Sequence, residues 1–178
     1  MRGLKERVNI LTNNSVPWKW RRICFTAKGL EYLEEDAVFS VETSSSWARL
    51  LNLVGASSAW FNLSRLMFKG TAGTDYLNAI DAKVDTQRVT PKYDRTITIN
   101  SGNDTGKFLD FKHWHPMNAN LVYADREQAE MDDSQERSAT GRAGMGDYYV
   151  VDLFACGDEN SANTLTFSPT ATLYWHEK

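Results

Sequence analysis

The chain has little cysteine and no long apolar run. These two features argue against a disulfide-rich secreted domain and against a helix that spans a membrane. Its 178 residues contain two cysteines, Cys24 and Cys156, far apart in the sequence. Two isolated cysteines do not make the disulfide framework of a small secreted domain, so we expect reduced, intracellular thiols. No apolar stretch approaches the roughly 20 residues that cross a bilayer. The charged first residues lack the apolar stretch of a secretory signal, and we expect no membrane partner.

The usual catalytic motifs are missing as well. The sequence contains no Walker pattern, no Gly-x-Ser-x-Gly elbow and no His-Glu-x-x-His. Gly141, Gly144 and Gly146 do not follow a strand into a helix, so they do not form a phosphate cradle. Neither cysteine has a neighbourhood that favours a reactive thiolate. We therefore predict a protein that is not an enzyme, with no catalytic residue and no cofactor.

Two groups of side chains suggest metal binding, and in both the structural interpretation is favoured. His113 and His115 share a face if their segment is extended, but a third ligand is not apparent and a closed zinc site needs four ligands. Carboxylates between residues 125 and 133 offer the oxygen ligands of calcium, without the spacing of a helical calcium loop. We therefore predict no metal site. The carboxylates in question are Asp125, Glu127, Asp132 and Asp133.

What the chain does have is enough apolar and aromatic sequence for one packed domain. Hydrophobic residues make up 42% and aromatic residues 12%, which excludes a disordered chain. Charge is unevenly spread, since residues 1–30 are strongly basic and residues 121–160 strongly acidic. Such a chain could present a cationic face to one partner and an acidic face to another, or simply have an uneven solvated surface.

Strand-like segments separated by turn residues dominate the chain. Pro169 predicts a bulge or bend in the last of them. Many short strands without a strand–helix–strand rhythm favour a sandwich or barrel, and about eight strands suit a jelly roll. We expect one domain over residues 1–178. The expected strands are 7–12, 18–27, 64–69, 83–89, 94–100, 107–115, 120–124, 147–155 and 164–175.

One segment has helical spacing instead. Between residues 44 and 63, Trp47, Leu50, Leu51 and Val54 recur at i, i+3, i+4 and i+7, and we expect a short helix there. Ser46 could cap it and Gly55 could end it. Residues 125–146 are polar and acidic and predict a long surface loop. The predicted fold class is therefore all-β, a jelly-roll β-sandwich with a short helix in a long inter-strand connection.

Two aromatic and basic stretches are candidates for binding nucleic acid. In a strand, Trp18, Trp20 and Arg22 would share one face, and bases stack on aromatic rings while phosphates pair with cations. The alternative is that the tryptophans are core or subunit contacts. Lys107 and Lys112, interleaved with aromatic residues, have the same two interpretations. The candidate nucleic-acid-binding residues are Trp18, Lys19, Trp20, Arg21, Arg22, Lys28, Lys107 and Lys112.

Five blocks of the sequence, in order, resemble the capsid proteins of small circular single-stranded DNA viruses. The resemblance is to the genomovirus (gemycircularvirus-type) group, relatives of the geminiviruses, and it extends from Arg2 to about Phe154. Five blocks in one order are more specific than any one alone. The blocks read RGLKERVNI, VPWKWRRICFTAKG, RTITINSGNDTGKF, KHWHPMNANLVYADRE and GMGDYYVVDLF.

This resemblance implies a jelly-roll coat subunit that assembles with copies of itself into an icosahedral-type shell around circular single-stranded DNA. It also implies a place in the virion and, during assembly, in the host nucleus. The family carries an arginine-rich N-terminal arm that binds DNA. This sequence opens at Met1-Arg2, nearly inside the first matching block, so we expect the arm, and also the first strand of the sandwich, to be missing.

Two other functions stay open on the residues alone. One is a free-standing module that binds single-stranded nucleic acid through the same tryptophans, with strong salt dependence. The other is a glycan-binding jelly roll or hydrolase, which needs paired carboxylates in a cleft. The acidic residues here are concentrated in what the sequence predicts to be a loop.

Overall fold

The computed structural model describes residues 1–30, 40–44, 47–55, 57–128, 131–141, 143–158 and 160–176. Two compact units make up the chain. The first comprises Met1–Cys24, Lys92–Asn120 and Val150–Lys178, and the second comprises Phe25–Pro91 and Leu121–Tyr149.

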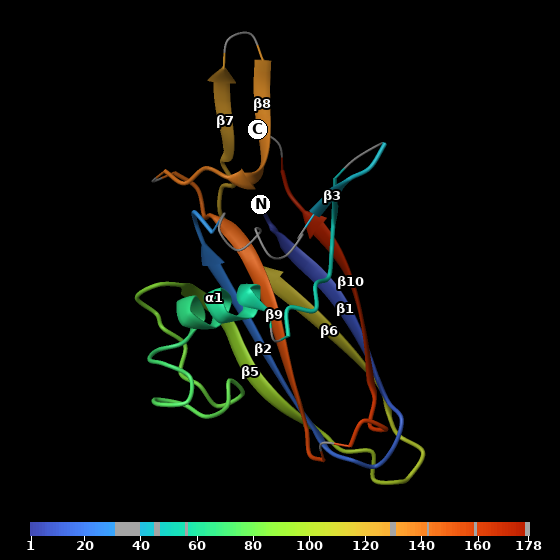
Figure 1. Ribbon diagram of the computed structural model, residues 1–178. Coiled ribbons are helices and arrows are strands. Elements are labelled where there is room, and N and C mark those ends of the chain that lie inside the picture. The colour runs from blue at the N-terminus through green and yellow to red at the C-terminus, as the bar shows by residue number, and fades with distance from the viewer. Residues whose placement is uncertain are drawn as a thin grey trace. The chain divides into compact units, whose positions relative to one another are not determined.

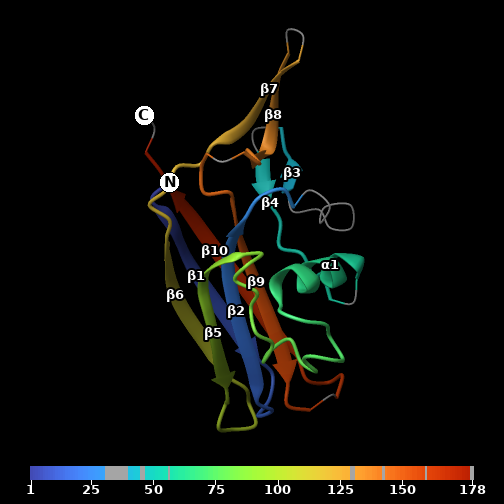
Figure 2. The same ribbon diagram turned by 90° about the vertical axis from the view of Figure 1, so that its left-hand side faces the viewer.

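The chain forms an all-β sandwich of two three-stranded antiparallel sheets, and most residues of these strands belong to the first unit. One sheet has the order β10-β1-β6, with β10 at Leu165–Tyr174, β1 at Gly3–Thr12 and β6 at Phe108–Pro116. The other has the order β5-β2-β9, with β5 at Thr90–Ile99, β2 at Trp18–Ala27 and β9 at Asp147–Cys156. The neighbouring strands of each sheet can be followed in Figure 1, and Figure 2 shows them after a quarter turn. The strands predicted at 7–12, 18–27, 94–100, 107–115, 147–155 and 164–175 are confirmed.

The core of the sandwich follows from alternation along β1. Val8 and Ile10 are fully buried, whereas Lys5, Arg7 and Leu11 on the opposite face are exposed. Alternation of this kind is typical of a sheet with one face on the core and one in water. The core cluster consists of Val8, Ile10, Trp20 and Ile99, against which Trp18, Ile97, Leu109, Phe111, Phe154, Leu165 and Phe167 pack.

Strand β10 pairs with β1 in an unbroken register, so there is no bulge at Pro169, where a bulge or bend was predicted. The Asn13 amide donates to the carbonyl of Thr164 (3.3 Å) in the same register. Backbone groups alternate in direction along an antiparallel strand, so even-numbered residues of β10 bond to β1 and odd-numbered ones face its free edge. The nitrogen of Pro169 therefore lies at the free edge, where no ladder bond is lost.

Gly106, in the connection from β5 to β6, is needed for a close approach of two backbones. Its φ is +81°, and a Cβ there would lie 1.9 Å from the carbonyl oxygen of Thr12. The approach lets the Thr12 amide donate to Lys107 O (3.0 Å) and the Lys107 amide donate to the Thr12 hydroxyl (3.0 Å). This contact joins the end of β1 to the start of β6.

The second unit contains the helix, which lies later in the chain than predicted. Helix α1 spans Ser58–Met67, and the Ser57 hydroxyl caps it by accepting from the Trp60 amide (3.4 Å). Residues 47–49 are instead strand β4 (Trp47–Arg49), paired with β3 (Ser40–Glu42). Residues 50–54 belong to no helix or strand, and Leu51 and Leu53 are exposed there. The predicted cap Ser46 lies outside the described residues.

Four further predictions fail in whole or in part in this unit. Residues 64–67 are helical, and 83–89 form a single bridge, Phe68–Val84, and turns, so neither predicted strand exists. Strand β7 (Tyr123–Gln128) overlaps only the end of the strand predicted at 120–124. It pairs with β8 (Met131–Ser138), so the loop predicted at 125–146 is largely a hairpin. The carboxyl groups considered for calcium belong to this hairpin, and their side chains lie outside the described part.

Candidate binding surface

The predicted binding segment 18–22 lies in β2, and three of its five side chains are buried. Trp20, Arg21 and Arg22 are 1%, 6% and 2% exposed, whereas Lys19 is exposed. Trp18 packs on the core, and its Nε1 is buried with no hydrogen-bond partner among the described residues. The face that Trp18, Trp20 and Arg22 share is thus the face turned into the sandwich. In a single copy of the chain, Trp20 and Arg22 do not reach solvent.

Arg22 is held by two carboxylates inside the sandwich. Its Nε and Nη2 donate to the two carboxylate oxygens of Asp152 on β9, at 2.7 and 2.8 Å, and its Nη1 donates to Glu6 on β1. Trp20 Nε1 donates to the same Asp152 (2.7 Å). The guanidinium carbon lies 5.2 Å from the Trp20 ring centroid, a cation–π distance. Because these contacts use the guanidinium, Arg22 is a structural cation and is not available to a phosphate.

The contacts of the buried cluster shift the pKa values of Glu6 and Arg22 toward the charged forms of both groups. Burial by itself would raise the pKa of Glu6, but the hydrogen bond from His115 and the charge of Arg22 outweigh it and hold that pKa below its ordinary value. For Arg22, burial opposes the charge, and Asp152 and Glu6 still hold the pKa above its ordinary value. The ion pairs therefore stay formed at neutral pH.

His113 and His115 both point into the sandwich, as their spacing predicts. His115 is 3% exposed and its Nε2 lies 3.1 Å from the Glu6 carboxylate. The Nε2 of His113 is buried without a hydrogen-bond partner in the described part of the chain. Burial and the nearby Arg22 charge lower the pKa of His113, which favours its neutral form. Among the described residues, no group of three or more His, Cys, Asp and Glu side chains could hold a metal ion.

The remaining candidate residues lie in several places and do not form one site. Arg21 donates from Nε (2.8 Å) and Nη2 (2.7 Å) to the carboxylate of Asp94 on β5. The Lys28 ammonium group donates to the carbonyls of Gly141 (2.6 Å) and Ala143 (2.8 Å) in the second unit. Lys107 and Lys112 are exposed in and beside β6. Of the eight candidates, only Lys112 lies on the exposed outer surface of the β10-β1-β6 sheet.

That surface is the outer face of the β10-β1-β6 sheet, which consists of the residues that alternate outward on its three strands. The register places Lys5 between Trp114 and Thr172, and Arg7 between Lys112 and Thr170. Leu11 (47%) and Phe108 (64%) are exposed at one end. The outward residues are Gly3, Lys5, Arg7, Asn9 and Leu11 on β1, Phe108, Asp110, Lys112, Trp114 and Pro116 on β6, and Thr166, Ser168, Thr170, Thr172 and Tyr174 on β10.

The other end of the outer face carries an aromatic pair that depends on a glycine. Trp114 and Tyr174 come from opposite edges of the sheet, yet their ring centroids are 5.7 Å apart in an edge-to-face arrangement. Gly3 is paired with Tyr174 and is the outward residue next to Lys5, the partner of Trp114. A Cβ on Gly3 would be 2.6 Å from the Trp114 ring. The missing side chain gives the indole room to cross β1. Trp114 and Tyr174 remain 52% and 43% exposed.

Only part of this surface is evident from the sequence. Lys112 beside Phe108 and Trp114 was a predicted binding residue, whereas Lys5, Arg7 and the β10 residues were not. Alternation along residues 3–12 and 165–174 carried the signal, because every second position there except Leu11 is charged, polar or small. The strand pairing that brings these positions together could not be derived from alternation.

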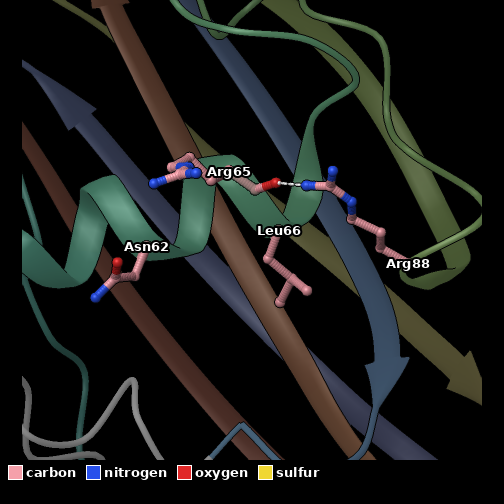
Figure 3. Close-up of a pocket in the computed structure, with 4 residues that line it drawn as sticks. All are labelled: Asn62, Arg65, Leu66 and Arg88. Atoms are coloured by element: carbon pink, nitrogen blue, oxygen red, sulfur yellow. Dashed lines mark hydrogen bonds between the residues drawn. The ribbon is translucent and has the colours of Figure 1, made fainter.

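A small hollow lies on the second unit beside α1. Its volume is about 220 Å³, and Asn62, Arg65, Leu66 and Arg88 line it. Figure 3 shows a guanidinium nitrogen of Arg88 donating to the backbone carbonyl of Arg65. Arg88 also forms an ion pair with Asp85 (3.3 Å). The Arg88 charge is therefore already matched within the chain, and the hollow shows no arrangement of catalytic groups.

Comparison with protein-family models, curated proteins and solved structures finds no match to this chain. Within the described residues, α1 is too short and too polar to cross a bilayer, and no other helix could do so.

Proposed function

We propose that the chain is a structural subunit of a virus capsid, which assembles with copies of itself into a shell enclosing circular single-stranded DNA. The five sequence blocks that resemble capsid proteins of genomovirus type lead to this proposal. Virion and host nucleus are the places where such a subunit acts.

The observation that carries the proposal is the strand order of the sandwich. In a jelly roll, the common architecture of viral shells, eight strands form sheets in the order first-eighth-third-sixth and second-seventh-fourth-fifth. The order β10-β1-β6 corresponds to eighth-third-sixth, and the order β9-β2-β5 to seventh-fourth-fifth. One strand on the free edge of β10 and one on the free edge of β9 would complete the pattern. The agreement of all six strands with this order supports the proposal.

Exposed apolar side chains support self-association. Leu53 and Leu77 are 100% and 94% exposed, and Leu51 is 67% exposed. Isolated surface leucines are ordinary, but Leu51 and Leu53 lie together beside half-exposed Leu50. Contact with another copy would remove this apolar surface from water, at about 25 cal/mol per Å² of buried area. The chain therefore offers apolar surface of the kind that subunit interfaces use.

The test is electron microscopy of the purified chain together with light scattering at rising concentration. We expect particles or capsomers of uniform size, because closed symmetric assemblies have a fixed copy number. Material dissociated in high salt and returned to low salt should give the same size, which separates assembly from aggregation. A monomer at every concentration, or aggregates of mixed size, would contradict the proposal.

A second candidate is a monomeric module that binds single-stranded nucleic acid. The observation that favours it is the outer face, where Lys5, Lys112 and exposed Trp114 lie together. Trp20 and Arg22 no longer support it, because both are buried. Tight binding by the monomer without any particle would favour this candidate over the capsid.

A further inference from the structure

We propose that the outer face of the β10-β1-β6 sheet is the surface that contacts single-stranded DNA. Bases stack on the Trp114–Tyr174 pair, and Lys5 and Lys112 pair with phosphates. The choice of DNA as the ligand rests on the proposed function. The surface itself is argued from its own side chains.

The aromatic pair is a stacking platform held open to solvent. Trp114 and Tyr174 touch each other across Gly3 and are about half exposed. Large aromatic side chains normally bury most of their area. A tryptophan that remains half exposed on a sheet surface can therefore stack with a flat ligand. Base–aromatic stacking does not depend on sequence, because every base has a π face.

Two lysines lie beside this aromatic pair, at neighbouring positions of the same sheet face. Lys5 lies directly opposite Trp114, and Lys112 is the next outward residue on β6. Arg7 is engaged by Asp110 through three donor–acceptor contacts of 2.6 to 3.1 Å. The outer face thus has three cations and one carboxylate, and its balance is positive in a chain whose net charge is −3. A polyanion is attracted here by charge, and neutral or cationic partners are not.

Strand β10 adds neutral hydrogen-bonding groups along the same face. Hydroxyls follow one another at every second residue, roughly 7 Å apart along the strand. Hydroxyl donors contact phosphate and sugar oxygens without reading sequence. No carboxylate lies among the outward residues of β10, so this row does not repel a phosphate backbone. The hydroxyl residues are Thr166, Ser168, Thr170 and Thr172, all exposed.

The alternative occupant is another protein, since exposed tryptophan and arginine also anchor protein interfaces. The salt dependence of binding distinguishes a DNA ligand from a protein partner. A DNA contact at Lys5 and Lys112 makes affinity fall with salt, because each neutralised phosphate releases counterions. An apolar protein contact at Trp114 has no such dependence.

The experiment measures binding of a fluorescently labelled 20-nucleotide oligo-dT to the full chain by anisotropy, over a series of salt concentrations. We expect the double variant Lys5→Glu/Lys112→Glu to bind at least ten-fold more weakly. The salt slope should fall in magnitude by about 1.4, from two phosphate contacts at roughly 0.7 each on a single strand. Trp114→Ala should lose about ten-fold, and Trp114→Phe should retain most of the affinity because it keeps a π face.

Lys92→Glu is the matched control, because it reverses an exposed lysine on β5 of the other sheet. It should leave binding unchanged, and near-ultraviolet circular dichroism should show that every variant is folded. Equal losses in Lys92→Glu and the double variant would overturn the inference, as would undetectable binding by the wild type. Failure of the capsid proposal looks different, since then no particles form whichever residues bind DNA. Uniform shells of the double variant with wild-type DNA content would overturn this inference alone.

Discussion

Arg22 shows how a single buried charge can shape the interior of a small sandwich. It pairs with Asp152 on the neighbouring strand and with Glu6 on the opposite sheet, so one guanidinium links both layers. A buried ion pair of this kind adds little net stability compared with apolar residues, but losing one partner is costly because the other charge stays unpaired. Replacing any one of Arg22, Glu6 and Asp152 would therefore leave a buried charge with one partner fewer.

Asp152→Asn should destabilise the fold by about 3–5 kcal/mol, because it leaves the buried Arg22 with one carboxylate in place of two. Urea unfolding followed by tryptophan fluorescence would measure this. Asp110→Asn is the matched control, since its partner Arg7 lies at the surface with a side chain 60% exposed. Exposed pairs contribute little. Similar losses in the two variants would contradict the structural role of Asp152.

Acid should weaken the fold in two steps. The pKa of folded His113 lies below the ordinary 6.5, so between the two values the unfolded chain binds more protons and stability falls as pH drops. The pKa of folded Glu6 lies below 4.5, so its contribution is present above that pH and is lost as pH falls through the folded value. Urea midpoints between pH 7 and pH 3 would show both steps. His113→Phe should remove only the first step, and an unchanged profile in this variant would refute its assignment.

The sequence correctly predicts that Trp18, Trp20 and Arg22 share one face of a strand. It does not predict whether that face is turned into the sandwich or toward solvent. Alternation gives the relative direction of side chains, whereas burial depends on the second layer. The second layer joins β1 to β6 and β10, two strands more than 80 residues away from Arg22. The carboxylate partners of Arg22 could not be assigned, because Glu6 reaches it by packing of the two sheets and Asp152 by the pairing of β2 with β9.

At the level of elements, the direction of each backbone amide decides where an edge strand can hold a proline. Pro169 occupies a position of β10 whose nitrogen faces the free edge, and the register with β1 is unbroken there. Pro116 does the same on β6, because the Thr12 amide bonds to Lys107 and odd-numbered residues of β6 therefore face β1. Both outer edges of this sheet thus carry a residue that cannot donate. Proline at an edge hinders pairing with a foreign strand.

Two proline substitutions one residue apart should therefore differ sharply. Thr170→Pro removes an amide that bonds to β1 and should cost about 1–3 kcal/mol, because a β1 carbonyl loses its partner. Ala171→Pro places the ring nitrogen at the free edge and should cost far less. Thermal unfolding of the two variants side by side measures the difference. Equal destabilisation would mean that the direction assigned to β10 is wrong.

The elements themselves were predicted unevenly, for physical reasons. The six sandwich strands are alternating or apolar runs between turns, and they were recognised from that pattern. The helix predicted through Trp47, Leu50 and Leu51 fails because a helical stripe needs a surface to bury it, and Leu51 stays exposed. The real helix follows the capping Ser57, whose signal was overlooked. The β7–β8 hairpin was missed because its sequence is polar and acidic.

At the level of the whole molecule, the sandwich has two layers and four edges. Strands β5 and β6 end one side of each sheet, and β9 and β10 end the other. Phe154 on β9 and Phe167 on β10 meet with ring centroids 5.3 Å apart, so the second pair of edges closes over aromatic residues that are only partly buried. Strand β9 has no proline and no lysine or arginine to discourage pairing. Strand addition at this side would extend both sheets and cover these rings.

The alternation along β10 also divides its backbone amides into two classes for hydrogen exchange. Amides of Thr166, Ser168, Thr170 and Thr172 are locked in the ladder to β1, and exchange there requires opening of the sheet. The amides of Phe167, Ala171 and Leu173 face the free edge, and they exchange without opening of the sheet. A strand docking on this edge would slow the second class alone. Three amide signals would thus report, residue by residue, when β10 ceases to be an edge.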